Sequence, residues 1–192
     1  LLPGIASGDT VATLAWVEDN GDWGAEGTTL TASASGALNG HKSYVVDGHT
    51  ADLIVVLARG PAGLSLYTVA GNAAGLTRRA LKTMDPTRKM ARLEFNNVAA
   101  TPLGTPGGAL APFERTMVEA AICLSNEMVG GAERLREDAL AYAMMRVQFG
   151  KQIASFQSMK HKAADMLLEV ELAKSAAYFA AAALDDGDAD IA

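Results

Sequence analysis

The sequence predicts an α+β protein of two domains, with an antiparallel β-barrel or sandwich over residues 1–104 and the start of a helical bundle over residues 105–192. Three observations support this division. Up to about Val98 the chain is rich in glycine, threonine and valine, and turn residues break it into short apolar runs. The connection from Thr101 to Pro112 is rich in proline and glycine. After it, apolar residues recur every three or four positions, as on one face of a helix.

Five runs in the first domain are typical of strands. They are DTVATLAWV, SYVV, ADLIVVLA, GLSLYTV and ARLEF, and they are separated by glycine, asparagine and aspartate residues that favour turns. Short runs separated by such turn signals predict the strands of an antiparallel sandwich or barrel.

Two long helices are expected in the second domain. The first begins near Phe113 and runs to about Gln148, where we expect Gly150 to end it. The second runs from about Phe156 to Leu184. A helix of roughly 35 residues is about 50 Å long, so a hairpin of two such helices leaves faces of both unburied. Because bundles of this kind usually close with four or more helices, we expect the chain to be part of a larger protein. A first residue that is not methionine and the acidic ending also fit this expectation.

Composition and charge narrow the classes of function. The hydrophobic content of 49% and the charged content of 20% are ordinary for a globular protein. The net charge of −6 and the lack of a basic run argue against a nucleic-acid partner. No signal peptide is recognisable and no apolar stretch is long enough to span a membrane, so we expect a cytoplasmic protein. The single cysteine, Cys123, is expected to be buried. The histidines are scattered, and no metal site is expected.

Two segments resemble a known protein family. Residues 146–166, RVQFGKQIASFQSMKHKAADM, are similar to the Arg-x-x-Phe-Gly-x-x-Ile-x-x-Phe-Gln…Ala-Asp-Met signature of the acyl-CoA dehydrogenases. Upstream, LNGHKSYVVDGHTADLIVVLAR resembles the Leu-x-Gly-x-Lys-x-Trp-Ile-Thr-Asn-Gly segment of the same family. The chain is therefore identified as a member of this family, and it resembles the middle β-domain and the first two helices of the C-terminal domain.

The resemblance implies an FAD-dependent oxidoreductase that oxidises an acyl-CoA thioester in lipid catabolism. In such enzymes a carboxylate removes a proton from the carbon next to the thioester carbonyl, and hydride leaves the adjacent carbon for flavin N5. The resemblance also implies an electron-transfer flavoprotein as electron acceptor and a homodimer or homotetramer. Two alternatives stay open, namely a non-catalytic or half-site subunit of a heteromeric enzyme and an unrelated β-sandwich binding module with a dimerising helical hairpin.

The candidate catalytic base is Glu114. One branch of the family has a Glu-Arg pair at the start of this helix, and its glutamate is the base. The resemblance makes Glu114 the matching residue and places Arg115 in the acyl-CoA site. A glutamate in the first turn of a helix is also favoured by the helix dipole, whether or not it takes part in chemistry. In many members the base lies in a later loop, outside this chain.

One group of candidate cofactor residues replaces the Trp-Ile-Thr of the family. This chain has Tyr44, Val45 and Val46 at those positions. An aromatic ring is kept for stacking on the flavin, and the hydroxyl near N5 is lost. Without the resemblance, these residues are equally well interpreted as the core of an ordinary strand.

A second group replaces the Thr-Glu-Pro and Gly-Ser-Asp of the family. The first triplet appears as Val17, Glu18 and Asp19, and the second as residues 21–23. The resemblance implies that Val17 and Glu18 contact the pyrimidine edge of the flavin through backbone amides. It places Trp23 in the substrate site.

A third group lies where the two helices are joined. Arg146, Gln148 and Phe149 match residues that in the family reach the FAD of the other subunit, and arginine is suited to a pyrophosphate. Gln157 matches a position near the adenosine half of the cofactor. Taken alone, an arginine at the end of a helix is also a favourable charge at the helix C-terminus.

Overall fold

The computed structural model describes residues 1–187, and the chain forms two compact units that divide between Glu114 and Arg115. We call residues 1–114 the sheet unit and the residues from 115 onwards the helical unit. The bounds 1–104 and 105–192 for the two domains stay a prediction, and residues 188–192 of the second lie outside the described residues.

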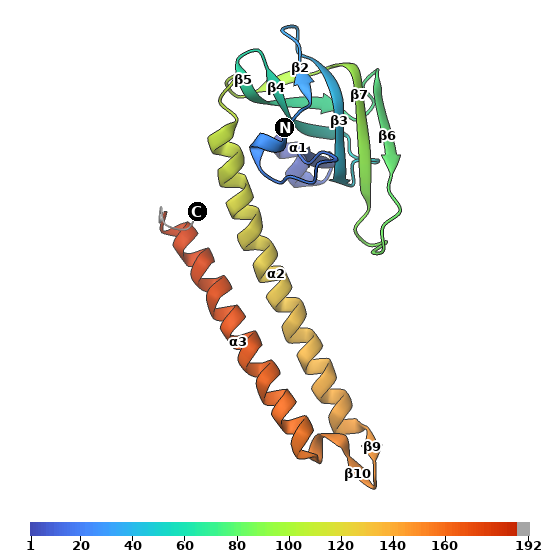
Figure 1. The fold of residues 1–192 in the computed structure, drawn as a ribbon, viewed down its shortest axis with the longest axis vertical. Helices are drawn as coiled ribbons and strands as arrows, with labels where there is room; N and C mark the ends of the chain where they lie inside the picture. The colour runs from blue at the N-terminus through green and yellow to red at the C-terminus, as the bar shows by residue number, and fades with distance from the viewer. Residues whose placement is uncertain (188–192) are drawn as a thin grey trace. The chain divides into compact units, whose positions relative to one another are not determined.

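The sheet unit contains one eight-stranded sheet. Its elements are α1 (Leu2–Ser7), β1 (Ala12–Ala15), η1 (Ala25–Gly27), β2 (Thr31–Ala32), β3 (Ala37–Val46), β4 (Leu53–Gly60), β5 (Gly63–Ala70), β6 (Leu76–Ala80), β7 (Met90–Ala99) and β8 (Thr101–Leu103). The strands follow the order β6-β7-β3-β2-β4-β5-β8, and β1 pairs with β4 outside this path. Figure 1 labels β2 to β7 of this sheet.

The sheet is mixed and not wholly antiparallel. Most neighbours are antiparallel, but β4 pairs in parallel with both β1 and β2. Long connections separate β1 and β2 from β4, and a parallel neighbour requires such a connection where an antiparallel neighbour needs only a turn. Within residues 1–187 the path does not close, so a sandwich is consistent with the structure and a closed barrel is not found. The predicted α+β fold class is confirmed.

All five predicted runs contain strands, while β2, β6 and β8 were not predicted. Two of the missed strands have two or three residues, which is too short for a visible alternation. The third, β6, has the sequence LTRRA and is largely exposed at the end of the sheet. Charged residues are common on such edge strands because they oppose pairing with another chain.

The core of the sheet unit is made of aliphatic side chains from the central strands. Leu38, Ile54, Val56, Leu93 and Val98 are completely buried. The start of the long helix is fastened to this unit, because the Ala109 amide donates to the Leu64 carbonyl over 3.2 Å and Phe113 is buried. This packing explains why the compact unit extends to Glu114.

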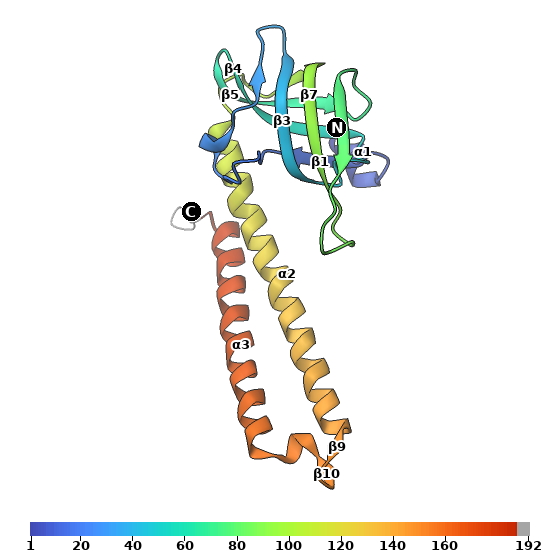
Figure 2. The same cartoon turned by 45° about the vertical axis from the view of Figure 1, so that its right-hand side comes forward.

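The two long helices are antiparallel, as predicted. They are α2 (Leu110–Met145) and α3 (Gln157–Asp185), and the elements between them are β9 (Val147–Gln148), β10 (Lys151–Gln152) and η2 (Ile153–Ser155). In Figures 1 and 2 α2 and α3 lie side by side. The Lys174 Nζ lies 2.6 Å from Glu133 Oε1 of the other helix, and the Asn126 side chain donates to the Ala177 carbonyl over 3.4 Å.

The expectation that Gly150 ends the first helix is wrong. The helix ends at Met145, and Gly150 lies in the turn that joins β9 to β10. Phe149 and Gly150 have φ angles of 54° and 78°. Two successive residues with positive φ form a tight hairpin turn, and the backbone twist of this turn matches the twist of the two strands that it joins. Glycine suits this turn for the same reason that it suits a helix end, since both require positive φ.

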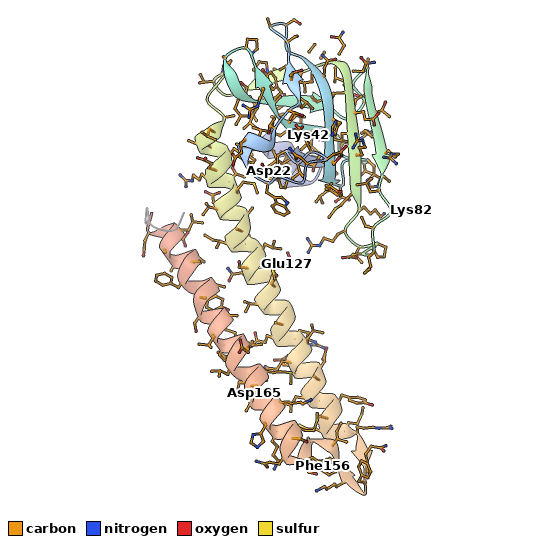
Figure 3. All side chains as sticks on the ribbon, viewed as in Figure 1. Asp22, Lys42, Lys82, Glu127, Phe156 and Asp165 are labelled. Carbon is orange, nitrogen blue, oxygen red and sulfur yellow. The ribbon has the colours of Figure 1, made fainter. Side chains whose placement is uncertain are left out.

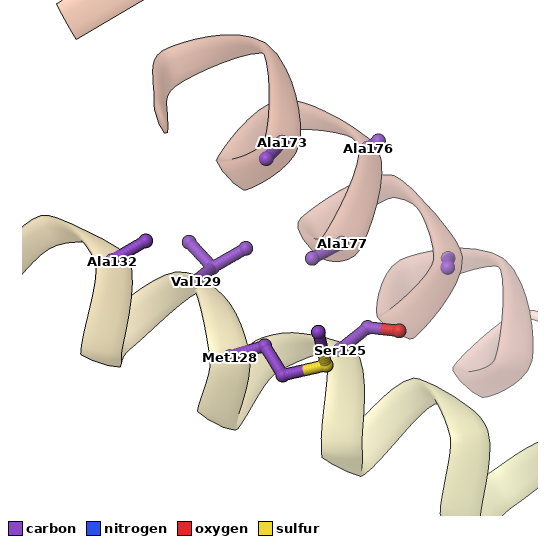
Figure 4. A pocket seen from close by; sticks show the side chains of 8 residues that line it. Ser125, Met128, Val129, Ala132, Ala173, Ala176 and Ala177 are labelled. Carbon is purple, nitrogen blue, oxygen red and sulfur yellow. The ribbon is translucent and has the colours of Figure 1, made fainter. Parts of the chain in front are cut away.

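Large apolar side chains on both helices are exposed, as expected for a hairpin of two helices. Leu135 is 71% exposed and Phe179 is 74% exposed. Between the helices lies an apolar groove of about 490 Å³. Figure 4 shows Val129 and Ala132 of α2 on one side of it and Ala173 of α3 on the other. Cys123 is exposed on α2, so the expectation of burial is wrong for this chain.

Candidate functional site

A lysine and a glutamate form a buried ion pair inside the sheet unit. Lys42 of β3, which is labelled in Figure 3, is completely buried, and Glu18, which follows β1, is 3% exposed. The Lys42 Nζ lies 2.8 Å from Glu18 Oε1 and donates to the Trp16 carbonyl over 2.8 Å. The two charged groups therefore satisfy each other in a core that is mainly apolar.

The Glu18 carboxylate also holds the chain just before β2. It accepts hydrogen bonds from the backbone amides of Thr29 and Leu30, each 2.9 Å long, and from the Thr29 hydroxyl. Burial raises the pKa of Glu18, but the hydrogen bonds from Lys42, Thr29 and Leu30 outweigh burial and the pKa lies below its ordinary value. Burial lowers the pKa of Lys42 more than Glu18 raises it. Because the carboxylate is used inside the unit, any contact of Glu18 with a cofactor has to come from its backbone.

A β-bulge in β3 follows directly on this pair. The register between β3 and β7 shifts between Lys42 and Val45, and Tyr44 has a φ angle of 57°. Positive φ is uncommon for a bulky residue, and bulges redirect side chains. Tyr44 is 55% exposed, whereas Val45 is buried in the core. The Tyr44 ring is thus available for stacking, while Val45 offers a ligand only its backbone.

The other valines of the predicted cofactor set differ in their exposure. Val46 is exposed, and its carbonyl accepts a hydrogen bond from the Thr13 hydroxyl over 2.6 Å. Val17 is buried, and its carbonyl accepts from the Ser43 amide over 2.8 Å. The structure therefore connects Val17 directly to the bulge, which brings the two predicted groups of β-domain residues together.

Sequence reasoning missed a polar network beside the bulge. Asp19 accepts hydrogen bonds from the Ser43 hydroxyl and from Arg92 of β7, and His41 Nε2 lies 3.2 Å from its other carboxylate oxygen. The hydrogen bond from Arg92, followed by that from Ser43, lowers the pKa of Asp19 to about 2. Arg92 is 73 residues from Asp19 along the chain, so no local pattern indicated the contact.

We expect the sheet unit to lose stability as the pH falls from about 4 towards about 2. The pKa of Asp19 is lower in the folded protein than in the unfolded chain, so its ion pair stabilises the fold above the unfolded pKa. That contribution is lost as the pH falls through the folded pKa. Glu18, whose pKa is also lowered, acts in the same direction. The loss due to Asp19 is moderate because this side chain is half exposed.

The urea midpoint, followed by tryptophan fluorescence, measures this dependence. Asp19→Asn should have a lower midpoint at neutral pH and a flatter pH profile than the wild type. An unchanged profile in this variant would show that Asp19 does not contribute.

Two tryptophans lie next to the predicted cofactor segment. Trp23 is 63% exposed and packs edge-on against Trp16, with ring centroids 6.0 Å apart. The Trp16 indole nitrogen is buried and has no hydrogen-bond partner among the described residues. Trp23 therefore presents an aromatic surface on the sheet unit, as a residue that contacts a substrate would.

Glu114 and Arg115 are both exposed, but not in the first turn of a helix as expected. Because α2 begins at Leu110, Glu114 is the fifth residue of the helix and the interpretation from the helix dipole does not apply. The Arg115 Nε lies 2.8 Å from Glu119 Oε1, one turn further on. Arg115 thus makes a surface ion pair along its own helix.

The third group of predicted residues gathers at the connection between α2 and α3. Arg146, Gln148, Phe149 and Gln157 are all exposed. The Ile153 amide donates to the Arg146 carbonyl over 2.9 Å, which closes the hairpin of β9 and β10. Phe149 is 91% exposed and packs edge-on against Phe156 at 6.2 Å between ring centroids. The connection is therefore an ordered structure that presents a cation, amides and an aromatic ring together.

Comparison with known proteins identifies the family. The family model described as the C-terminal domain of acyl-CoA dehydrogenases matches residues 111–192. The acyl-CoA dehydrogenase IpdE2 of Mycobacterium tuberculosis is 36% identical over 143 residues, which are 74% of this chain and 40% of that protein. The chain belongs to the acyl-CoA dehydrogenase family.

Solved structures of related proteins share the fold of this chain. Butyryl-CoA dehydrogenase from Megasphaera elsdenii matches with a TM-score of 0.87 and 27% identity, over 97% of this chain and 52% of that chain. PigA, solved with FAD and proline, matches with a TM-score of 0.87 and 30% identity over the same shares. The chain thus spans about half the length of the family members that it matches.

Two further observations concern residues 1–187 only. No helix there is both long and apolar enough to cross a membrane. No group of three or more histidine, cysteine, aspartate or glutamate side chains is placed to hold a metal ion.

Proposed function

We propose that the whole protein is an FAD-dependent acyl-CoA dehydrogenase, which removes hydrogen from adjacent carbons of an acyl-CoA thioester. The observation that carries the proposal is Tyr44, whose aromatic ring is turned out of the sheet by a strained bulge. Residues in rare backbone conformations are frequent at binding sites, where the surrounding structure maintains them. The exposed Tyr44 ring alone does not specify a reaction, and the proposal of dehydrogenation rests on membership of the acyl-CoA dehydrogenase family.

The residues of the sheet unit fit the ring system of a flavin. The exposed Tyr44 ring offers a stacking surface, and the backbone from Val17 to Asp19 lies beside the bulge through the Val17–Ser43 hydrogen bond. When bound, FAD supplies the acceptor for the hydride. In the helical unit, Arg146 is suited to the pyrophosphate of the FAD in a second copy of the chain, with Gln148 and Phe149 beside it. Gln157 lies near the adenosine half of that cofactor.

The reaction requires a base and a site for the thioester. We assign the base to Glu114, and we assign the acyl-CoA site to Trp23 and Arg115. Because residues of two copies bind each FAD, the protein is a homodimer or homotetramer. An electron-transfer flavoprotein accepts the electrons from the reduced flavin.

A half-site subunit of a heteromeric enzyme is the second candidate. The exposed side chain of Val46 cannot donate a hydrogen bond to a flavin ring, and those of Val17 and Val45 are buried. Such a subunit would complete the cofactor site of a partner and have no activity by itself.

The visible spectrum of the full-length protein tests both candidates. A flavin band that bleaches anaerobically when an acyl-CoA is added supports the enzyme. A protein that takes up no flavin even when reconstituted with FAD contradicts the independent enzyme and favours the half-site subunit.

We expect Arg146→Ala to weaken FAD binding about 10- to 100-fold, because a hydrogen bond to a charged group contributes about 1.5–3 kcal/mol. Arg146→Lys should lie between the wild type and the alanine variant, since lysine keeps the charge and loses the planar fork. Titration of the apoprotein with FAD, followed by flavin fluorescence, measures the affinity.

Arg134→Ala is the matched control for this experiment, because Arg134 is an exposed arginine of α2 that pairs with Asp138 on its own helix. If the Arg146→Ala and Arg134→Ala proteins bind FAD with equal affinity, Arg146 does not contact the cofactor.

A further inference from the structure

The buried pair of Lys42 and Glu18 has no evident purpose in stability alone. The hydrophobic core of the sheet unit consists mainly of aliphatic side chains. Replacing a buried ion pair by apolar residues of similar volume is often neutral or stabilising, because both ions lose their hydration in the core. A lysine that is completely buried therefore calls for an explanation in terms of the conformation that it maintains.

The pair fixes the residues just before the bulge from outside the β-ladder. Lys42 binds the Trp16 carbonyl and Glu18, and Glu18 binds the amides of Thr29 and Leu30. The next residue, Ser43, donates its amide to the Val17 carbonyl over 2.8 Å. Lys42 and Ser43 are thus both bound to the segment that follows β1.

This attachment determines where the extra residue of β3 has to go. The regular pairing of β3 with β7 stops after Lys42 opposite Leu93 and resumes at Val45 opposite Ala91. Because Lys42 and Ser43 are held and Val45 is buried in the core, the surplus residue is displaced at Tyr44. A left-handed conformation of a tyrosine persists only where its surroundings impose it.

We propose that Lys42 and Glu18 are positioning residues, which hold Tyr44 in its outward, left-handed conformation and thereby set the affinity for the flavin ring. The second half of this inference rests on the proposed function, whereas the first half concerns the backbone of this chain alone. Without the pair, β3 is free to regain an alternating register, in which Tyr44 turns towards the core and no longer presents its ring.

The test uses the full-length protein carrying Glu18→Gln together with Lys42→Met. The introduced amide oxygen still accepts from the Thr29 and Leu30 amides, and the methionine fills the volume of the lysine without a charge. No buried charge is left unpaired, so the fold is expected to survive. The matched control is Lys82→Met, the same change at an exposed lysine in the β6–β7 connection (Figure 3).

Two readouts are needed for the double variant. Backbone chemical shifts of residues 43–45 report the conformation of Tyr44 whether or not FAD binds. Titration of the apoprotein with FAD reports the affinity. We expect Tyr44 to leave the left-handed conformation and the dissociation constant for FAD to rise about 10-fold or more, as for the loss of one good contact. The Lys82→Met protein should match the wild type in both.

The outcomes separate this inference from the proposed function. If Tyr44 keeps its left-handed conformation in the double variant, the positioning role is refuted. If the conformation changes and FAD affinity stays within about twofold of wild type, the link to flavin binding is refuted. If the wild type takes up no FAD, the proposed function fails, and the chemical shifts still decide the positioning role.

A second variant, Glu18→Gln alone, covers the case of a double variant that does not fold. It leaves Lys42 without its carboxylate, but burial already lowers the pKa of this lysine, so the side chain can lose its proton instead of remaining as an unpaired charge. Glu18→Gln alone leaves Lys42 its bond to the Trp16 carbonyl and an amide oxygen as acceptor. It should shift both readouts in the same direction by a smaller amount. Wild-type values for both readouts in this folded protein would overturn the inference.

Discussion

Lys42→Met by itself should lower the free energy of unfolding of the sheet unit by about 3–5 kcal/mol, the usual effect of removing one member of a buried ion pair. The Glu18 carboxylate would be left buried with its backbone donors and no cation. Without the hydrogen bond from Lys42, burial raises the pKa of Glu18. The Glu18 carboxylate then has to take up a proton or become hydrated. The double variant with Glu18→Gln should recover most of this loss, since it leaves no charge in the core.

Urea unfolding followed by tryptophan fluorescence measures this effect selectively. Both tryptophans of the chain, Trp16 and Trp23, lie in the sheet unit, so their fluorescence reports that unit. Lys82→Met should change the midpoint little, because exposed residues away from such features rarely contribute more than about 0.5 kcal/mol. A loss below about 1 kcal/mol in Lys42→Met would mean that the pair behaves like an exposed one.

Glu114→Gln should slow the reduction of the flavin by acyl-CoA about 10²- to 10⁴-fold, the usual contribution of a positioned general base. The amide has nearly the shape of the carboxylate but does not accept a proton. Flavin content and thermal stability should match the wild type, since Glu114 is exposed. The rate of anaerobic bleaching in a stopped-flow instrument measures the effect.

The control for Glu114→Gln is Glu137→Gln, the same change at another exposed position of α2, which should leave the bleaching rate unchanged. If Glu114→Gln protein bleaches as fast as wild type, the base is a residue outside this chain. If neither protein contains flavin, the proposed function is at fault and not the assignment of the base.

Local sequence patterns were enough for the long elements and for the strands of the core. The spacing of three and four placed α2 and α3 within a few residues of their ends, because the face of a helix depends only on residues close together in the chain. The apolar runs predicted β4, β5 and β7 for a similar reason. Gly150 shows the limit of such patterns, since positive φ serves both a helix end and a hairpin turn.

The candidate site depended on contacts that no local pattern contains. Alternation along β3 from the buried Lys42 would place Tyr44 in the core and Val45 on the surface, and the bulge reverses this assignment. The sequence also gave no reason to expect the Glu18 side chain to be used up by Lys42, 24 residues away. Such pairings arise only when distant strands meet.

The sequence by itself determined the family, the fold class and the residues to examine, because spacing and residue type are properties of short segments. Only the tertiary structure decided which of those residues face outward. In the folded chain Val17, Val45 and the Glu18 carboxylate are buried and the Tyr44 ring is exposed. Asp19 accepts a hydrogen bond from Arg92. The physical reason is that a side chain's exposure and its charge partner are set by strands that pack from elsewhere in the chain.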